Sequence, residues 1–300
     1  MTGIIIKALS GFYYAKADGV IYECKARGSF RKSGISPLVG DRVEIEKTGE
    51  SSGIVDKILP RKNAIIRPPV ANIDKLFIIS SHTNPQPNSF LIDKMTVTAR
   101  YNNIEPIIVF NKCDMGDFSY WEKIYKNAGF KVYVASAEEN LGIDCIMGEL
   151  EGCISAFTGN SGVGKSSILN RLLNRNIETG SVSEKLGRGR HTTRHTELYP
   201  VENGGFVADT PGFSTFELSC DNYDLKEKLA DCFFDFDEFA PNCRFSGCTH
   251  TKEAGCAVLE AVNEGKIEET RHKSYLQLFE EMKDLKPWQA KKASLSGNMK

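Results

Sequence analysis

The 300-residue sequence has no apolar run that approaches the roughly 20 residues of a membrane-spanning helix. Its first residues, MTGIIIKALSG, contain only a short apolar run, and they lack the basic region and longer apolar core of a secretory signal. These two absences exclude a membrane-spanning or exported protein from our interpretation. We therefore expect a cytoplasmic protein without membrane partners.

The sequence also lacks a strong charge of one sign, because 38 Lys and Arg stand against 39 Asp and Glu. This balance argues against a surface that is uniformly basic, as expected for a protein that binds nucleic acid along its whole length. The charge is uneven, since residues 1–70 have an excess of basic residues and residues 217–242 an excess of acidic ones. Charge alone supports no function for either segment.

Disulfides are not expected either, because a cytoplasmic chain keeps its thiols reduced. Nine cysteines are also an odd number. We interpret four scattered cysteines as small buried or idle thiols, namely Cys24, Cys113, Cys145 and Cys153.

Residues 1–68 are predicted to be all-β, because short β-rich pieces such as GVIYECKA and DRVEIEK alternate with Gly, Ser and Pro breaks. Small barrels with this spacing often bind oligonucleotides. Within this part, RGSFRK (Arg27–Lys32) places three cations around Phe30. It is either a loop that contacts phosphates and stacks a base, or an exposed basic hairpin.

From residue 72 the pattern changes to alternating apolar strands and amphipathic helices, which predicts a doubly wound, mainly parallel sheet. The strands are expected in DKLFIIS, PIIVFNKCD, FKVYVASAE and ISAFTGNS, with two more around Glu197–Val201 and Gly205–Ala208. After Phe216 an acidic, helical segment is expected, followed by a charged helical stretch from about Ala257 to Asp284.

The segment GNSGVGKS matches the phosphate-binding loop G-x-x-x-x-G-K-[ST], and it lies between an apolar strand and an apolar helix. Its glycines let backbone N–H groups point at phosphates, and the next helix adds its positive N-terminus. Lys165 would reach the β- and γ-phosphates, and the Ser166 hydroxyl would ligate Mg²⁺. The predicted phosphate-binding residues are Gly159, Asn160, Ser161, Gly162, Val163, Gly164, Lys165, Ser166 and Ser167.

Two further segments have the features of a guanine-binding site. In NKCD, a buried Asp114 would accept hydrogen bonds from N1–H and the exocyclic amine of guanine, a donor pair that adenine lacks. Asn111 would tie the loop together and meet the ring edge, and the stem of Lys112 would lie over the base. Farther along, Ser136 and Ala137 in VASAEE fit a second loop whose backbone N–H meets O6.

Two segments are predicted to sense the γ-phosphate. In DTPG, Asp209 would hold Mg²⁺ through water and the Gly212 N–H would meet the γ-phosphate. In GRGRHTTRHT, a threonine would ligate Mg²⁺; we favour Thr193, with Thr192 as the alternative. Phe213 stands where many GTPases have a water-orienting glutamine, so intrinsic hydrolysis should be slow.

His191 is the internal residue best suited to assist hydrolysis, because it can accept or donate a proton. The predicted catalytic residues are therefore His191, Lys165 and Thr193.

The base-reading segments precede the phosphate loop, whereas the usual order begins with that loop. We interpret this order as a circular permutation of one sheet, which is tolerated where the old termini lie close together. The strand that ends in DTPG then becomes the last strand of its domain. The segment after this strand is therefore tied directly to the γ-phosphate sensor.

That segment includes the pattern Cys243-x₄-Cys248-x-His250-x₅-Cys256. Three thiolates and one imidazole make a closed tetrahedral site for one structural Zn²⁺. No coordination position remains open, so a catalytic metal is not expected. We expect this metal to hold together a segment with little apolar core of its own.

Taken together, these residues resemble the circularly permuted GTPases of the RsgA (YjeQ/YloQ) family, over nearly the whole chain. RGSFRK, NKCD, SAE, GNSGVGKS, GRHTT, DTPGF and the Cys-Cys-His-Cys pattern carry the resemblance. It implies an OB-fold RNA-binding domain at residues 1–68, a circularly permuted α/β P-loop GTPase domain at 69–218 and a mainly helical zinc domain at 219–300.

The resemblance also implies a function, which is GTP hydrolysis stimulated by the 30S ribosomal subunit during late maturation of that subunit, with contacts to 16S rRNA. In that family the histidine that matches His191 has been proposed to assist hydrolysis. The alternative is an RNA-binding module whose GTP site is structural or regulatory and turns over negligibly; Phe213 keeps this alternative open. A P-loop ATPase or kinase is disfavoured by Asp114. No exposed apolar stripe demands a partner copy, so we expect a monomer.

Overall fold

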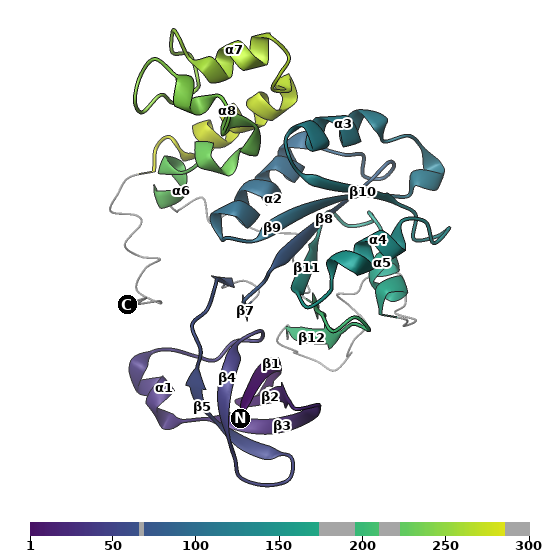
Figure 1. The fold of residues 1–300 in the computed structure, drawn as a ribbon, viewed down its shortest axis with the longest axis vertical. Helices are drawn as coiled ribbons and strands as arrows, with labels where there is room; N and C mark the ends of the chain where they lie inside the picture. Colours follow the sequence, from purple (N-terminus) through teal and green to yellow (C-terminus); the bar gives the residue numbers. More distant parts are fainter. Residues whose placement is uncertain (66–68, 174–195, 210–222, 286–300) are drawn as a thin grey trace.

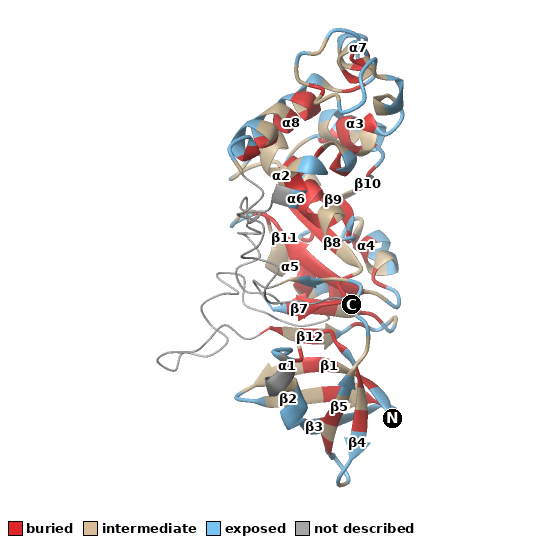
Figure 2. Ribbon diagram, turned by 90° about the vertical axis from the view of Figure 1, so that its left-hand side faces the viewer, coloured by how far each residue is buried: buried red, intermediate tan, exposed pale blue. Residues whose placement is uncertain are grey.

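The computed structural model describes residues 1–65, 69–173, 196–209 and 223–285. A β-barrel, an α/β unit and a helical unit lie in a row along the longest axis of the molecule (Figure 1). Buried residues follow the strands of the barrel and sheet and the facing sides of the helices (Figure 2). None of the helices in the described ranges is long and apolar enough to span a membrane.

The barrel has five strands, which neighbour one another in the order β1-β2-β3-β5-β4 and close through a β1–β4 pair. Alternate residues of these strands point inward and are fully buried, as Ile5, Val43 and Val55 show. The predicted all-β barrel is thereby confirmed. Its strands are β1 (Thr2–Leu9), β2 (Phe12–Ala17), β3 (Val20–Ala26), β4 (Arg42–Lys47) and β5 (Ser52–Ile58).

The prediction of a loop or hairpin at Arg27–Lys32 is wrong, because Gly28–Ser33 forms the short helix α1. Gly34 ends this helix with a left-handed backbone (φ 69°), and its N–H donates to the Phe30 carbonyl. The Phe30 side chain is partly buried and packs against the main hydrophobic core. The Arg27 guanidinium is also engaged, in ion pairs of 2.6 and 2.7 Å with Glu46 and Asp56.

The α/β unit contains the predicted parallel sheet, with β10, β9, β8, β11 and β13 side by side and β12 antiparallel at the end. Its strands are apolar almost throughout because helices cover both faces. Its strands are β8 (Lys75–Ser81), β9 (Glu105–Asn111), β10 (Lys131–Ala135), β11 (Ile154–Thr158), β12 (Glu197–Pro200) and β13 (Phe206–Asp209).

Strand alternation assigns the helices to two faces of this sheet. Ile78 and Ile108 share a core with residues of α2 (Ser89–Tyr101) and α3 (Ser119–Asn127). Phe77, Ile79 and Val109 instead share one with α4 (Ile143–Glu149) and α5 (Lys165–Leu172). A short pair of strands, β6 (Ala64–Ile65) and β7 (Val70–Ala71), lies in the connection from the barrel.

The barrel and the α/β unit share one continuous sheet of eleven strands. The junction is the antiparallel pairing of β1 with β12, where Lys7 is opposite Glu197. Both views place β12 between the barrel and the rest of the α/β sheet (Figures 1 and 2). A single core also spans the junction, since Leu198 packs in the same buried cluster as Ile5.

The helical unit contains α6 (Tyr223–Glu227), α7 (Ala257–Asn263) and α8 (Glu269–Met282). The predicted helical stretch from Ala257 to Asp284 is thus two helices, because Gly265 takes a left-handed backbone (φ 70°) between them. The expectation of little apolar core is wrong. Phe233, Phe236 and Tyr275 are among thirteen buried residues of one cluster, because aromatic rings from the acidic segment pack against α8.

A buried ion cluster joins this helical unit to the α/β unit. Arg271 on α8 is only 1% exposed, and its guanidinium donates to Asp93 on α2 and, at 2.9 and 3.1 Å, to Asp235. The same guanidinium lies 4.7 Å from the Phe233 ring centroid. Charges that are buried this deeply are tolerated only when they are paired and hydrogen-bonded. The cluster therefore fixes one way of docking α8 on α2.

Substitution Arg271→Ala should lower the free energy of unfolding by about 3–5 kcal/mol, because Asp93 and Asp235 would stay buried without their counter-charge. Urea unfolding measures this loss. Lys273→Ala is the matched control, since it removes an exposed ion pair with Glu269 on the same helix and should change little. Equal effects of the two substitutions would contradict the role given to Arg271.

Candidate nucleotide site and metal centre

The loop that carries GNSGVGKS leaves the carboxyl end of β11, in the middle of the parallel sheet, and leads into α5. Two of its glycines are required by close packing. Gly159 has φ 138°, and a Cβ there would lie 2.2 Å from the Ile79 carbonyl oxygen. Gly164 has φ 91°, and a Cβ there would lie 2.2 Å from Asn111 Nδ2. The loop is therefore packed against β8 and the end of β9.

The Lys165 ammonium donates to the carbonyl oxygens of Gly159 and Asn160, both at 2.7 Å, so the side chain curls over its own loop. Burial lowers the pKa of this ammonium to about 8. A bound polyphosphate would place negative charge beside this ammonium, and it would raise the pKa again and stabilise the charged form of the lysine. The geometry suits a lysine that meets phosphates.

The Asn111 side chain is 1% exposed and joins three loops. Its Nδ2 donates to the Val163 carbonyl at 2.9 Å, and its Oδ1 accepts from the Ala137 N–H at 3.1 Å. The structure thus brings together the NKCD, SAE and phosphate loops at one edge of the sheet. A base carbonyl that meets the SAE loop would share the Ala137 N–H with Asn111, because the Ser136 N–H already donates to Leu141.

Lys112 adopts a left-handed backbone (φ 66°), and its ammonium donates to the Gly162 carbonyl at 2.7 Å. Asp114 is exposed, which corrects the expectation of a buried carboxylate. Its Oδ1 accepts a hydrogen bond from the Ser136 hydroxyl. Because the residue is exposed, a bound base would itself have to bury this carboxylate. Selection of guanine over adenine therefore depends on the bound base, because only then would Asp114 be buried and an adenine leave it without hydrogen-bond donors.

Arg171 takes part in this arrangement, although it was not among the predicted site residues. From α5 its Nε donates to the Ala137 carbonyl at 2.9 Å, and a second nitrogen donates to Glu138 at 3.1 Å. It thereby ties the helix after the phosphate loop to the SAE loop. The arginine falls outside every motif, and only its position two turns along the helix could have drawn attention to it.

The predicted γ-phosphate sensors are only partly described. Asp209 is the last residue of β13, next to the strand that leads into the phosphate loop. Gly212, Phe213, His191, Thr192 and Thr193 lie outside the described residues.

The four predicted metal ligands converge, with their Sγ and Nδ1 or Nε2 atoms all within 4.8 Å of one another. His250 Nδ1 lies 3.4 Å from Cys256 Sγ and 3.6 Å from Cys243 Sγ. A tetrahedron with Zn–S bonds of about 2.3 Å and a Zn–N bond of about 2.0 Å would separate its ligand atoms by about 3.5–3.8 Å. The donor set and its spacing, which include Cys248, therefore fit a zinc ion.

A further set of groups orients this centre. His272 Nε2 donates to the His250 carbonyl at 2.8 Å, and the Tyr275 hydroxyl donates to the Thr249 carbonyl at 2.7 Å. The Glu253 carboxylate accepts from the N–H groups of Thr249 and Thr251 at 2.8 and 2.9 Å. Such supporting hydrogen bonds hold the ligand-bearing loop in shape.

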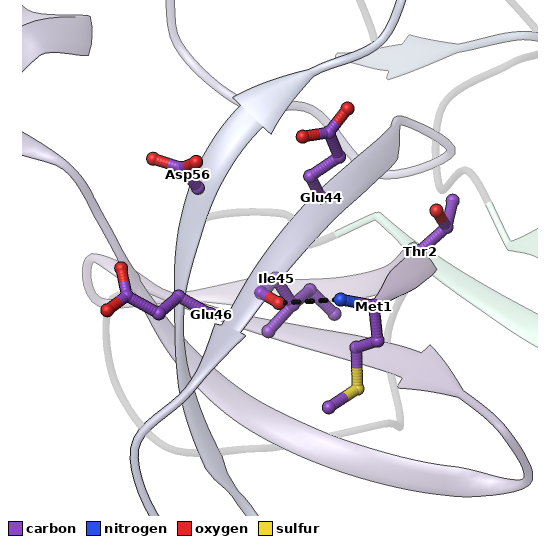
Figure 3. Close-up of a pocket in the computed structure, with 6 residues that line it drawn as sticks. All are labelled: Met1, Thr2, Glu44, Ile45, Glu46 and Asp56. Carbon is purple, nitrogen blue, oxygen red and sulfur yellow. Dashed lines mark hydrogen bonds between the residues drawn. The ribbon is translucent and has the colours of Figure 1, made fainter.

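A surface cavity of about 450 Å³ lies far from both centres, on the barrel (Figure 3). Glu44, Glu46 and Asp56 point around it, and the Met1 ammonium donates to the Ile45 carbonyl at 3.0 Å. Arg27 neutralises two of these carboxylates. The lining has no glycine, and its three carboxylates would repel phosphates, so the cavity does not suit a nucleotide.

Comparison with known proteins decides the family. Residues 58–219 match the family model described as RsgA GTPase, and residues 2–55 match the RsgA N-terminal domain. The chain belongs to the RsgA GTPase family. It is a GTPase with a circularly permuted catalytic domain.

Relatives and solved structures agree with this assignment. A small ribosomal subunit biogenesis GTPase RsgA of Caldanaerobacter subterraneus is 46% identical over 286 residues, covering 94% of this chain and 96% of the relative. One of the same name from Clostridium novyi is 45% identical, covering 94% and 97%. The crystal structure of YloQ, a circularly permuted GTPase, matches at TM-score 0.81 with 35% identity, covering 95% of this chain and 96% of that one. YjeQ from Thermotoga maritima matches at TM-score 0.79 with 32% identity, covering 95% and 99%.

Substitution Gly164→Ala should abolish GTP binding while the RsgA fold persists, because the added Cβ would displace the Asn111 amide that joins the three loops. Fluorescence titration with a labelled guanine nucleotide measures the affinity. Gly148→Ala is the control, since a Cβ at Gly148 on α4 meets nothing within 4 Å. Unchanged affinity in Gly164→Ala would show that the loops do not depend on this packing.

Substitution Cys248→Ser should remove about one zinc per chain and lower the melting temperature of the helical unit, because one of the four ligands is lost. Elemental analysis and thermal unfolding give the two readouts. Cys145→Ser removes an exposed thiol outside the cluster and should change neither. Full zinc content in Cys248→Ser would exclude this thiol as a ligand.

Proposed function

We propose that the chain is a GTP-dependent factor in late maturation of the small ribosomal subunit, working in the cytoplasm and stimulated by that subunit. The GTPase activity and the names of the relatives support this proposal. The main structural support for the nucleotide site is that the Asn111 side chain joins the three loops at the carboxyl edge of the sheet.

In this proposal the residues of Gly159–Ser167 hold the phosphates with backbone N–H groups, and Lys165 meets the β- and γ-phosphates. Asp114 reads the guanine edge, supported by Ser136, while Asn111 and Lys112 hold the base loop against the phosphate loop. Mg²⁺ held by Ser166 and Thr193, and through water by Asp209, would neutralise phosphate charge when it is bound.

Hydrolysis replaces the bond between the β-γ bridging oxygen and the γ-phosphorus with one from a water oxygen, giving GDP and phosphate. Lys165 stabilises the charge that develops on the bridging oxygen. His191 is proposed to orient the water or accept its proton, because Phe213 cannot hydrogen-bond it. The Gly212 N–H would contact the γ-phosphate.

We propose that the barrel and the helical unit contact 16S rRNA. On the barrel, the Lys25 ammonium lies 5.3 Å from the Phe12 ring centroid, which pairs a cation with an aromatic face. Beside the metal centre, Phe245 is 51% exposed and the Arg244 guanidinium lies 5.3 Å from its ring centroid. Such cation–aromatic pairs support contact with phosphates and unstacked bases. One zinc ion would hold the second pair in place.

Purified small subunits should raise GTP turnover by the monomeric protein at least about tenfold, by stabilising the hydrolysis-competent form. Phosphate release is measured for the protein alone, with small subunits and with large subunits. Large subunits serve as the control and should have little effect. If GTP binds but neither subunit raises turnover, the protein would instead be an RNA-binding module whose nucleotide site is structural or regulatory.

A further inference from the structure

Strand β1 changes partners half-way along its length. Its first half closes the barrel, with Thr2 opposite Glu44 and Ile4 opposite Arg42 on β4. A β-bulge lies between Ile5 and Lys7, and from Lys7 the strand pairs with β12 of the α/β sheet. Bulges redirect a strand and re-aim its side chains. Beyond this bulge β1 stays paired with β2 of the barrel, while its other edge passes from β4 to β12.

The junction forms a row of three residues across three strands. Lys7 on β1 is opposite Glu197 on β12, and Glu197 is in turn opposite Asp209 on β13. The Lys7 ammonium lies 3.1 Å from Glu197 Oε2, and both side chains are about one-third exposed. A lysine of the barrel therefore neutralises the residue that stands opposite the predicted γ-phosphate sensor.

Other contacts hold the same two strands from the barrel side. The Lys16 ammonium on β2 lies 5.7 Å from the ring centroid of Phe206, the first residue of β13. Leu198 on β12 is 1% exposed within the core that it shares with Ile5. Because β12 is only four residues long, its own ladder with β13 offers few hydrogen bonds. The barrel thus adds one strand pair, an ion pair and a shared core to the four β13 pairs that keep β12 in register.

We infer that Lys7 is a positioning residue for Asp209, acting through Glu197, so that the barrel helps to set the γ-phosphate sensor of the GTPase site. This inference rests on the role proposed above for Asp209. Two like charges directly opposite each other in an antiparallel pair are unfavourable. Lys7 cancels the charge of Glu197 and so removes the like-charge repulsion expected opposite position 209.

The inference is tested with the full-length protein without ribosomal subunits, by fluorescence titration with a non-hydrolysable GTP analogue and with GDP in the presence of Mg²⁺. Lys7→Ala should weaken binding of the analogue about fivefold, a coupling of ordinary size, and should leave GDP binding within about twofold. Lys7→Arg should restore the affinity. Lys57→Ala is the matched control, because it removes an exposed barrel ion pair with Glu44 that does not touch β12.

The double substitution Lys7→Ala with Glu197→Gln separates positioning from simple loss of docking. It removes the uncompensated carboxylate as well as the lysine, so affinity for the analogue should return to near the original value. A double variant as weak as Lys7→Ala would overturn the inference, as would equal losses for both nucleotides. Asp209→Asn tests the premise separately: if it fails to weaken the analogue more than GDP, the proposed role of Asp209 fails and the inference with it.

Discussion

The nucleotide site depends on one buried amide. Asn111 reaches from the end of β9 to the phosphate loop 52 residues later and to the SAE loop 26 residues later, and it satisfies both with single hydrogen bonds. The requirement for glycine at position 164 arises from the space that this amide occupies and from the left-handed backbone there, with φ 91°. These hydrogen bonds depend on where the three loops lie in space and not on their order in the sequence. A circularly permuted GTPase can therefore keep them.

More charged residues are paired within the molecule than the sequence suggests. The acidic segment 217–242 supplies Asp235 to the buried cluster around Arg271, and in the basic first segment Arg27 is paired with two barrel carboxylates. Counting charges along the chain therefore overstates what each segment presents to a partner. The pairs of a cation with an aromatic ring are better guides to a nucleic-acid contact, because they combine charge with a stacking face.

The sequence was sufficient wherever the signal is local. The phosphate loop, the order of the nucleotide-binding loops along the chain and the metal ligands are predicted by short motifs with fixed spacing, and the apolar runs identify the strands of the sheet. It was insufficient where partners are distant. Asp93 and Arg271 are 178 residues apart, so nothing near either one indicates their pairing. Helix α1 was not predicted, and its end depends on the left-handed backbone of Gly34. The exposure of Asp114 was not predicted either, because it depends on how the surrounding loops pack.

The barrel and the helical unit lie at opposite ends of the α/β unit (Figure 1). A large partner that touches both ends would hold the molecule at two separate points. Once the first end is bound, the second meets its target at a high effective concentration, so two weak contacts add up to strong retention. The two-point contact also allows release, because once one end has dissociated the other binds only with its own low affinity. A molecule of this shape can bind firmly and still leave quickly.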